Sequence, residues 1–224
     1  MKILLASASP ADVRWATDHG LVDGVVTSPA RLAQERAGDQ QAHRELLGEI
    51  ARGVGVPVHA SVASVDVADI HRDGRDLARV ADNLVVEVPL VDEAVTAIRR
   101  LQSEGVRVAA TLVFSAAQAL LAAKAGATTV VVPVDQLDAL GQDSLAVVRD
   151  VRQLFDRGGV ECDLVASLPK TAAAFTACGL AGADAVVLDL ASLRAFLVHP
   201  LTDRGVDAFL KELTARPRPR LAPA

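Results

Sequence analysis

The sequence is poor in cysteine, in aromatic side chains and in lysine. Its two cysteines, Cys162 and Cys178, are too few for a disulfide framework and lack the spacing of a zinc site, so each is predicted to be a small buried residue. Five Phe, one Trp and no Tyr leave no platform for stacking bases. A net charge of −5 and a pI near 5.5 give no basic footprint for nucleic acid. We therefore expect no nucleic-acid partner.

Long apolar runs are also absent, although 51% of the residues are hydrophobic. Runs such as Leu84–Val88 and Thr128–Pro133 end well before the roughly 20 residues that a membrane span needs. The first residues, MKILLASASP, hold an apolar run too short for a secretory signal. These absences predict a cytoplasmic protein with no membrane partner.

What the sequence does contain is a repeated couplet of a short β-branched run and an Ala/Leu/Arg-rich amphipathic stretch. Near-continuous apolar strands that alternate with helices indicate a parallel sheet covered by helices. Eight such units in 224 residues predict an α/β fold of the (β/α)8 barrel type. An open doubly wound sheet is the alternative, but no GxGxxG motif opens a helix. The expected strands are Lys2–Leu5, Leu21–Val26, Pro57–Val62, Leu84–Val88, Val106–Leu112, Thr128–Pro133, Glu161–Ser167 and Ala185–Leu188.

Helical periodicity is clearest in five stretches between these strands and in two segments after the last one. We expect one domain, a barrel with a C-terminal helix over residues 1–213, followed by a flexible Pro/Arg-rich tail over residues 214–224. The expected helices are Val67–Ala81, Asp92–Glu104, Ala116–Ala125, Ser144–Asp156, Thr171–Ala181, Ala191–Val198 and Val206–Leu213.

Four segments of the chain resemble the small transaldolases and fructose-6-phosphate aldolases. They are GLVDGVVTSP (Gly20–Pro29), LVVEVPL (Leu84–Leu90), LVFSAAQALLAAKAGA (Leu112–Ala127) and HPLTDRGVDAFLKE (His199–Glu212). The resemblance implies a class I aldolase fold, in which a lysine at the end of the fourth strand forms a Schiff base with a ketose unit. It also implies a homo-oligomer, because the terminal helix of such proteins packs against a neighbouring subunit.

The same resemblance places Glu87 where the family has its lysine, and a carboxylate cannot form an imine. Other family residues are replaced around the predicted barrel mouth, including the arginine that contacts phosphate, which aligns with Gln136. Thr111 and Ser167 match the family. The remaining replacements are Ala6, Ser9, Ser28, Ser61 and Ala109.

The predicted barrel and the family resemblance together give the candidate site residues, because the active sites of such barrels lie at the carboxyl ends of the strands. We expect Glu87 to be a general acid or base, with Thr111 and Ser167 holding a water or hydroxyl. Lys170 is a candidate anion-binding or relocated Schiff-base lysine, or else a solvated loop residue. Binding roles are expected for Ser28, Ser61, Asp135, Gln136 and Asp189. Asp135 and Asp189 are alternatively helix caps, and a metal held by the acidic residues is the least favoured interpretation.

Three hypotheses for function remain open. The first is a repurposed aldolase/transaldolase-type enzyme that acts on a small polar carbonyl or sugar-like metabolite through Glu87, with no cofactor. The second keeps the imine and moves it to Lys170. The third is a non-catalytic paralogue that binds a metabolite or assembles with a partner. His59 is interpreted as a structural or surface residue, and His199 as part of a structural turn.

Overall fold

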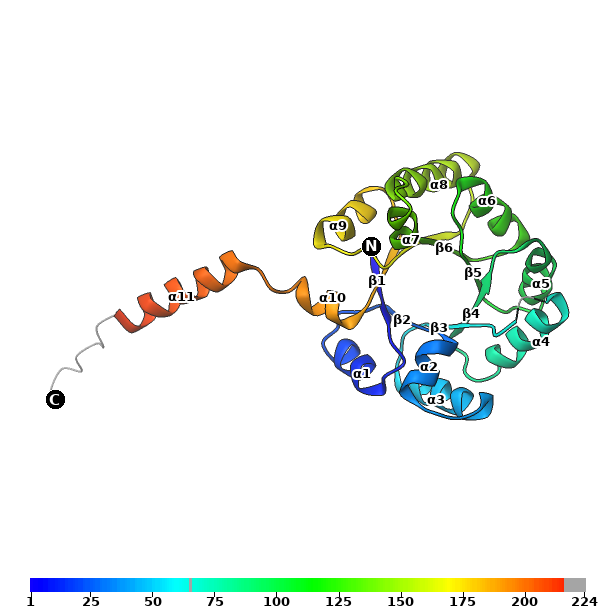
Figure 1. Cartoon of the computed structure of the whole chain (residues 1–224), viewed down its shortest axis with the longest axis horizontal. Helices are drawn as coiled ribbons and strands as arrows, with labels where there is room; N and C mark the ends of the chain where they lie inside the picture. Colours follow the sequence, from blue (N-terminus) through cyan, green and yellow to red (C-terminus); the bar gives the residue numbers. More distant parts are fainter. Residues whose placement is uncertain (65, 216–224) are drawn as a thin grey trace, which may run out of the picture. The chain divides into compact units, whose positions relative to one another are not determined.

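The computed structural model describes residues 1–64 and 66–215, and its centre is a closed barrel of eight parallel strands (Figure 1). The strands pair in chain order and β8 closes against β1, so the predicted (β/α)8 barrel is confirmed. Their bounds are β1 Lys2–Ala6, β2 Gly24–Thr27, β3 Val58–Ser61, β4 Leu84–Pro89, β5 Val108–Thr111, β6 Thr129–Pro133, β7 Asp163–Ser167 and β8 Ala185–Leu188.

Side chains alternate along each strand between the barrel lumen and the helix layer. The lumen contains a cluster of eight buried hydrophobic residues, most of them small or β-branched. On the outer side, Val86 of β4 packs toward Gly74 of α4, where a Cβ would lie 2.8 Å from Leu101 Cδ1. Gly74 therefore lets α4, α5 and β4 approach closely. The lumen cluster comprises Leu4, Ala6, Val85, Ala109, Val131, Val165, Ala185 and Val187.

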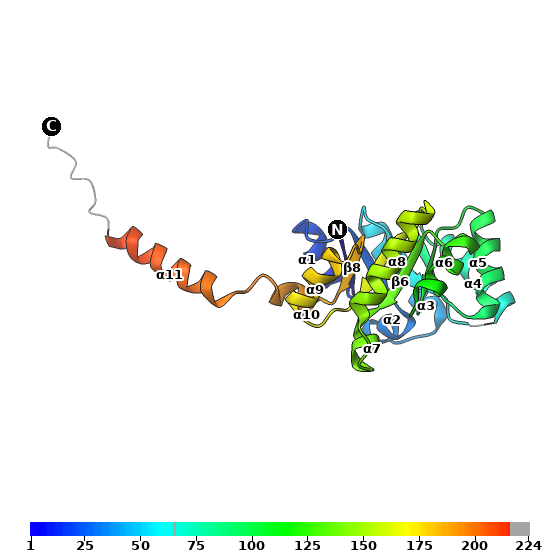
Figure 2. The same cartoon turned by 90° about the horizontal axis from the view of Figure 1, so that it is seen from above.

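Helices cover the outside of the barrel, as the two views of Figures 1 and 2 show for α4, α5, α6 and α8. Several begin at a Ser, Thr or Asp whose side chain accepts a backbone N–H, which satisfies one of the free donors of the first turn. The helices of the barrel unit are α1 Pro10–Asp18, α2 Pro29–Glu35, α3 Gln40–Gly53, α4 Val67–Ala78, α5 Asp92–Ser103, α6 Ala116–Ala125, α7 Val134–Ala139, α8 Ser144–Gly158 and α9 Ala172–Leu180.

Five predicted strands, the second, third, fifth, sixth and seventh, are longer than the observed ones. The second begins at Gly24 and not at Leu21, and the exposed Asp23 that precedes it accepts the N–H of Ile3 on its carboxylate at 2.8 Å. The fifth ends at Thr111, because Leu112 adopts a positive φ of 57° and leaves the extended conformation. The helices α1, α2, α3 and α7 were not predicted.

The chain divides into two compact units, Met1–Leu190 and the residues from Ala191 onward. The second unit contains most of α10 (Leu190–Ala195) and all of α11 (Pro200–Ala215). His199 Nδ1 accepts the N–H of Leu201 at 3.1 Å, in agreement with the predicted structural turn. The predicted tail begins within α11, and its residues 216–224 lie outside the described residues. Among the described residues, no helix is long and apolar enough to cross a membrane.

Candidate active site

Glu87 is a buried carboxylate in the barrel wall. Its neighbours in register are Ser61 on β3 and Ala109 on β5, and its side chain lies on the same face of β4 as Val85 of the lumen cluster. Only 6% of the residue is exposed. An ionisable group in such apolar surroundings needs partners, because burying an unpaired charge is costly.

Ser61 supplies one partner. Its hydroxyl donates a hydrogen bond to Glu87 Oε2 at 2.9 Å. The contact follows from the parallel pairing of β3 and β4, which places these two positions side by side in the lumen. The sequence predicted both residues for the site, and the structure brings them together.

His59 supplies the second contact and was missed as a functional residue. Its Nδ1 lies 3.3 Å from Glu87 Oε1, an ion-pair distance at which the ring is not aligned for a hydrogen bond. Only 6% of His59 is exposed, so it is not a surface residue, and the interpretation that it is structural stays untested. Its spacing of two from Ser61 puts both on one face of a strand, and that alternation is the signal that identifies it.

Two residues with left-handed backbone follow β5 and β7 at the same end of the barrel. Leu112 has φ 57° and Leu168 has φ 58°. Non-glycine residues adopt this conformation at a cost and often do so at functional sites. Leu168 packs against the lumen cluster, and each leucine directly follows a half-buried hydroxyl residue, Thr111 or Ser167.

Lys170 lies in the loop after β7, with its side chain 72% exposed. Its Nζ is 3.7 Å from Asp135 Oδ2, so two of the predicted site residues form an ion pair with each other. The chain has only four lysines, at positions 2, 124, 170 and 211, and all four are exposed. No lysine shares the buried setting of Glu87.

The other predicted binding residues occupy separate positions around the rim. Ser28 caps α2, where its hydroxyl accepts the N–H of Arg31 at 3.3 Å. Asp135 lies in the first turn of α7 and Gln136 is exposed on the same helix, whose N-cap position is Pro133. Asp189 is exposed and directly precedes α10. Within residues 1–64 and 66–215, no group of three or more His, Cys, Asp or Glu side chains is placed to hold a metal ion.

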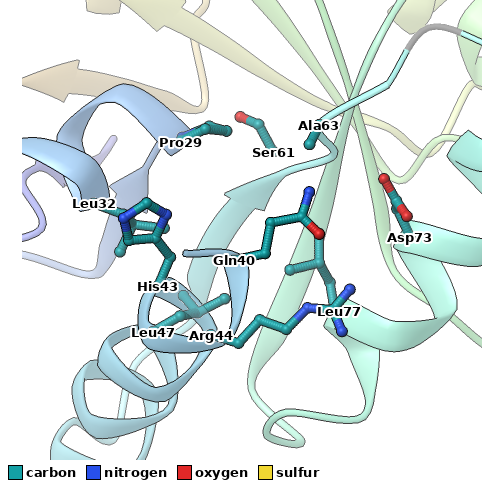
Figure 3. Close-up of a pocket in the computed structure, with 10 residues that line it drawn as sticks. All are labelled: Pro29, Leu32, Gln40, His43, Arg44, Leu47, Ser61, Ala63, Asp73 and Leu77. Carbon is teal, nitrogen blue, oxygen red and sulfur yellow. The ribbon is translucent and has the colours of Figure 1, made fainter. Parts of the chain in front are cut away.

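A small side pocket of about 80 Å³ lies next to Ser61 (Figure 3). Its walls come from α2, α3, α4 and the end of β3. Pro29, Leu32, Leu47, Ala63 and Leu77 make it largely apolar, and Gln40, His43, Arg44 and Asp73 add polar groups. A wider, open depression shares Pro29 and Ala63 with it and extends over Pro89 at the end of β4. This depression lies at the carboxyl ends of β2, β3 and β4, and Ser61, which lines the side pocket, links this region to Glu87 through its hydrogen bond.

The two cysteines are free and buried, as predicted. Burial raises the pKa of the Cys162 thiol to about 12 and that of the Cys178 thiol to about 11. Both thiols are therefore protonated at neutral pH and poor nucleophiles.

The sequence has many relatives among known proteins. A sequence model described as Transaldolase/Fructose-6-phosphate aldolase matches residues 10–218. A protein named probable transaldolase from Hyphomonas neptunium is 36% identical over 212 residues, which cover 95% of this chain and 96% of the relative.

Two further relatives carry the same name. The protein from Herpetosiphon aurantiacus is 38% identical over 94% of this chain and 93% of its own length. The one from Geobacter sulfurreducens is 33% identical over 97% of this chain and 100% of its own length. The chain belongs to the transaldolase/fructose-6-phosphate aldolase family.

Proposed function

We propose that the protein is an aldolase/transaldolase-type enzyme, a lyase or transferase, that acts on a small polar carbonyl or sugar-like metabolite. Its proton-transfer group is Glu87, and no imine forms at that position. The observation that carries the proposal is the buried carboxylate in the barrel wall, hydrogen-bonded by Ser61 and contacted by His59. Family membership supports the general class of chemistry.

Glu87 in its ionised form removes a proton from the carbon next to the substrate carbonyl. The electron pair of that C–H bond forms the C=C bond of an enolate, the carbonyl oxygen gains negative charge, and Glu87 keeps the proton. A hydroxyl donor near that oxygen stabilises the charge. Thr111 and Ser167 are half-buried hydroxyl residues at the ends of β5 and β7, and we assign this role to them.

Substrate specificity is assigned to the depression over β2–β4 and to the rim residues Ser28, Asp135, Gln136 and Asp189. The apolar side pocket of about 80 Å³ has room for a few non-hydrogen atoms. Gln136 stands where the family resemblance places a phosphate-binding arginine, and an amide does not replace that charge. The proposed substrate is therefore uncharged and small, and it is not a simple sugar phosphate.

Deuterium exchange provides a test that requires no knowledge of the full reaction. Dihydroxyacetone, hydroxyacetone and glycolaldehyde are incubated with the protein in D₂O, and loss of the α-proton signal is followed by NMR. We expect wild-type protein to exchange at least one of them and Glu87→Gln to lose about 100-fold or more in kcat. Glu104→Gln is the matched control, because Glu104 is a partly exposed carboxylate that also contacts a histidine. Equal exchange rates in wild type and Glu87→Gln would contradict the proposal.

The second candidate function keeps the imine and places it on Lys170. Lys170 is the one lysine in a loop at the carboxyl end of a strand, which is the observation in its favour. Its side chain is 72% exposed and lies 3.7 Å from Asp135 Oδ2, so it lacks the apolar surroundings that make a lysine amine nucleophilic. Lys170→Gln separates the candidates, since it abolishes exchange if the imine forms there and changes the rate less than about twofold if Glu87 acts alone.

A third possibility is a binding or assembly protein without turnover. It predicts that metabolites raise the melting temperature of the protein while none is exchanged or cleaved.

We further propose a cytoplasmic homo-oligomer that associates through α11. The apolar stripe Val206, Phe209, Leu210 and Leu213 on this helix is about half exposed and supports that proposal.

A further inference from the structure

A second cavity lies at the opposite end of the barrel from the proposed substrate site. Its volume is about 260 Å³, enough for several water molecules at about 30 Å³ each. Residues at or before the amino ends of the strands form its wall, among them Lys2, Asp23, Arg107, Thr129 and Asp163. His59 is part of the same wall.

His59 therefore contacts both Glu87 and this cavity. Its Nδ1 lies 3.3 Å from Glu87 Oε1, is shielded from water and has no aligned hydrogen-bond partner. Because Nδ1 is shielded, we assign the cavity side of the ring to Nε2. The backbone of His59 is held by Thr27, whose hydroxyl donates to the His59 carbonyl at 3.1 Å.

The charged groups around the cavity have other partners. Lys2 Nζ lies 3.1 Å from Asp163 Oδ2. Asp23 accepts the N–H of Ile3, and Arg107 donates to two backbone carbonyls, those of Asp82 and Leu84. Among the described residues of this wall, His59 is the titratable group that faces Glu87.

We infer that His59 is a positioning residue that relays protons between Glu87 and water in this cavity. Through this relay Glu87 loses or regains its proton at the end of the barrel opposite the substrate. The inference rests on the proposed role of Glu87. Leu168 packs against the lumen cluster at the carboxyl end of the barrel, the end at which substrate is proposed to bind. A second path lets Glu87 exchange its proton while substrate is bound.

The step balances without any other reactant. The protonated Glu87 Oε1–H gives its proton to Nδ1 of a neutral His59, and His59 Nε2–H gives its proton to a cavity water. The products are the Glu87 carboxylate, a neutral His59 protonated on Nδ1, and a hydronium ion that passes to bulk water. A flip of the ring then exposes the Nδ1 proton to the cavity, where it exchanges with water, and after the ring flips back the reverse sequence returns the exchanged proton to Glu87.

The test uses the deuterium-exchange assay on the full chain. We expect His59→Gln to lower kcat by about 10- to 100-fold with little change in KM, and to change the pH profile of kcat. We expect His59→Ala to regain activity when imidazole is added, and Glu87→Gln not to regain it. His71→Gln is the matched control, because His71 also pairs with a glutamate, at 2.7 Å, but lies outside the barrel lumen on α4. Thermal unfolding establishes that each variant is folded.

Two results overturn the relay. One is a folded His59→Gln with kcat within about twofold of wild type, and the other is a folded His59→Ala that imidazole does not activate. If wild type exchanges no compound, the proposed function fails, and ¹⁵N NMR of histidine-labelled resting protein then decides the relay. The relay predicts that His59 populates both neutral tautomers and that its ring N–H exchanges with water. A single tautomer with a slowly exchanging N–H overturns it.

Discussion

The hydrogen bond from Ser61 to Glu87 is the contact at residue scale with the clearest energetic consequence. Ser61→Ala leaves Glu87 Oε2 without this donor, so we expect a loss of about 1–3 kcal/mol in the free energy of unfolding. When Glu87 is replaced by leucine, Ser61→Ala should cost less than about 0.5 kcal/mol. Urea unfolding of the four proteins checks this double-mutant cycle. An equal cost in both backgrounds would show that the hydroxyl does not stabilise the carboxylate.

The buried thiols give a second prediction for single residues. Burial raises the pKa of Cys162 and Cys178 from 9.0 to about 12 and about 11, so the native state holds their protons at a pH where the unfolded chain releases them. The stability contributed by the neutral thiols is therefore lost as pH rises above about 9. We expect neither thiol to react with a disulfide reagent at pH 8 until the protein is unfolded. Rapid reaction of the native protein would contradict their burial.

Single-residue reasoning from sequence recovered part of the site. Glu87 and Ser61 were predicted because they end neighbouring strands, and the strand register places them in contact. The sequence-based prediction does not identify His59, because it does not use the alternation of side chains along a strand, which places His59 on the same face as Ser61. The ion pair of Lys170 with Asp135 joins the loop after β7 to α7, which follows β6, and no local pattern predicts such a contact.

At the scale of elements, the close packing of α4 against α5 and β4 depends on the absence of a side chain at Gly74. A Cβ there would lie within 3.0 Å of both Leu101 methyl carbons, in a fully buried contact. We expect Gly74→Val to destabilise the protein by about 1–3 kcal/mol, as measured by urea unfolding. Gly205→Ala on α11 is the matched control, since a Cβ there meets no atom within 4 Å and alanine favours helix by about 1 kcal/mol. A neutral Gly74→Val would show that the packing adapts.

The strands were easier to predict than the helices. All eight strands were found because a buried parallel strand is a compact apolar run. The helices α1, α2 and α7 were missed because each is only six to nine residues long and shows barely two turns of periodicity. The longer α3 was missed because the polar sequence QQAHRELLGEIARG hides its apolar stripe.

At the scale of the whole molecule, we expect α11 to carry the association of subunits. Phe209 and Leu213 are 59% and 47% exposed on one face of this helix, and burial of such a stripe is the usual reason for its presence. The double substitution Phe209→Asp and Leu213→Asp should lower the molar mass measured by light scattering toward that of one 23.3 kDa chain. Thr202→Asp on the same helix is the control and should leave the mass unchanged. An unchanged mass in the double variant would place the interface elsewhere.

The central claim is that a carboxylate, Glu87, transfers the proton and that no imine forms. Borohydride trapping tests this claim most directly. Wild-type protein is treated with borohydride in the presence of the carbonyl compound that it exchanges, and its intact mass and remaining exchange activity are measured together. We predict an unchanged mass and full remaining activity, because Glu87 cannot form an imine and no lysine shares its buried setting. An adduct that maps to Lys170, together with loss of exchange, would contradict the account.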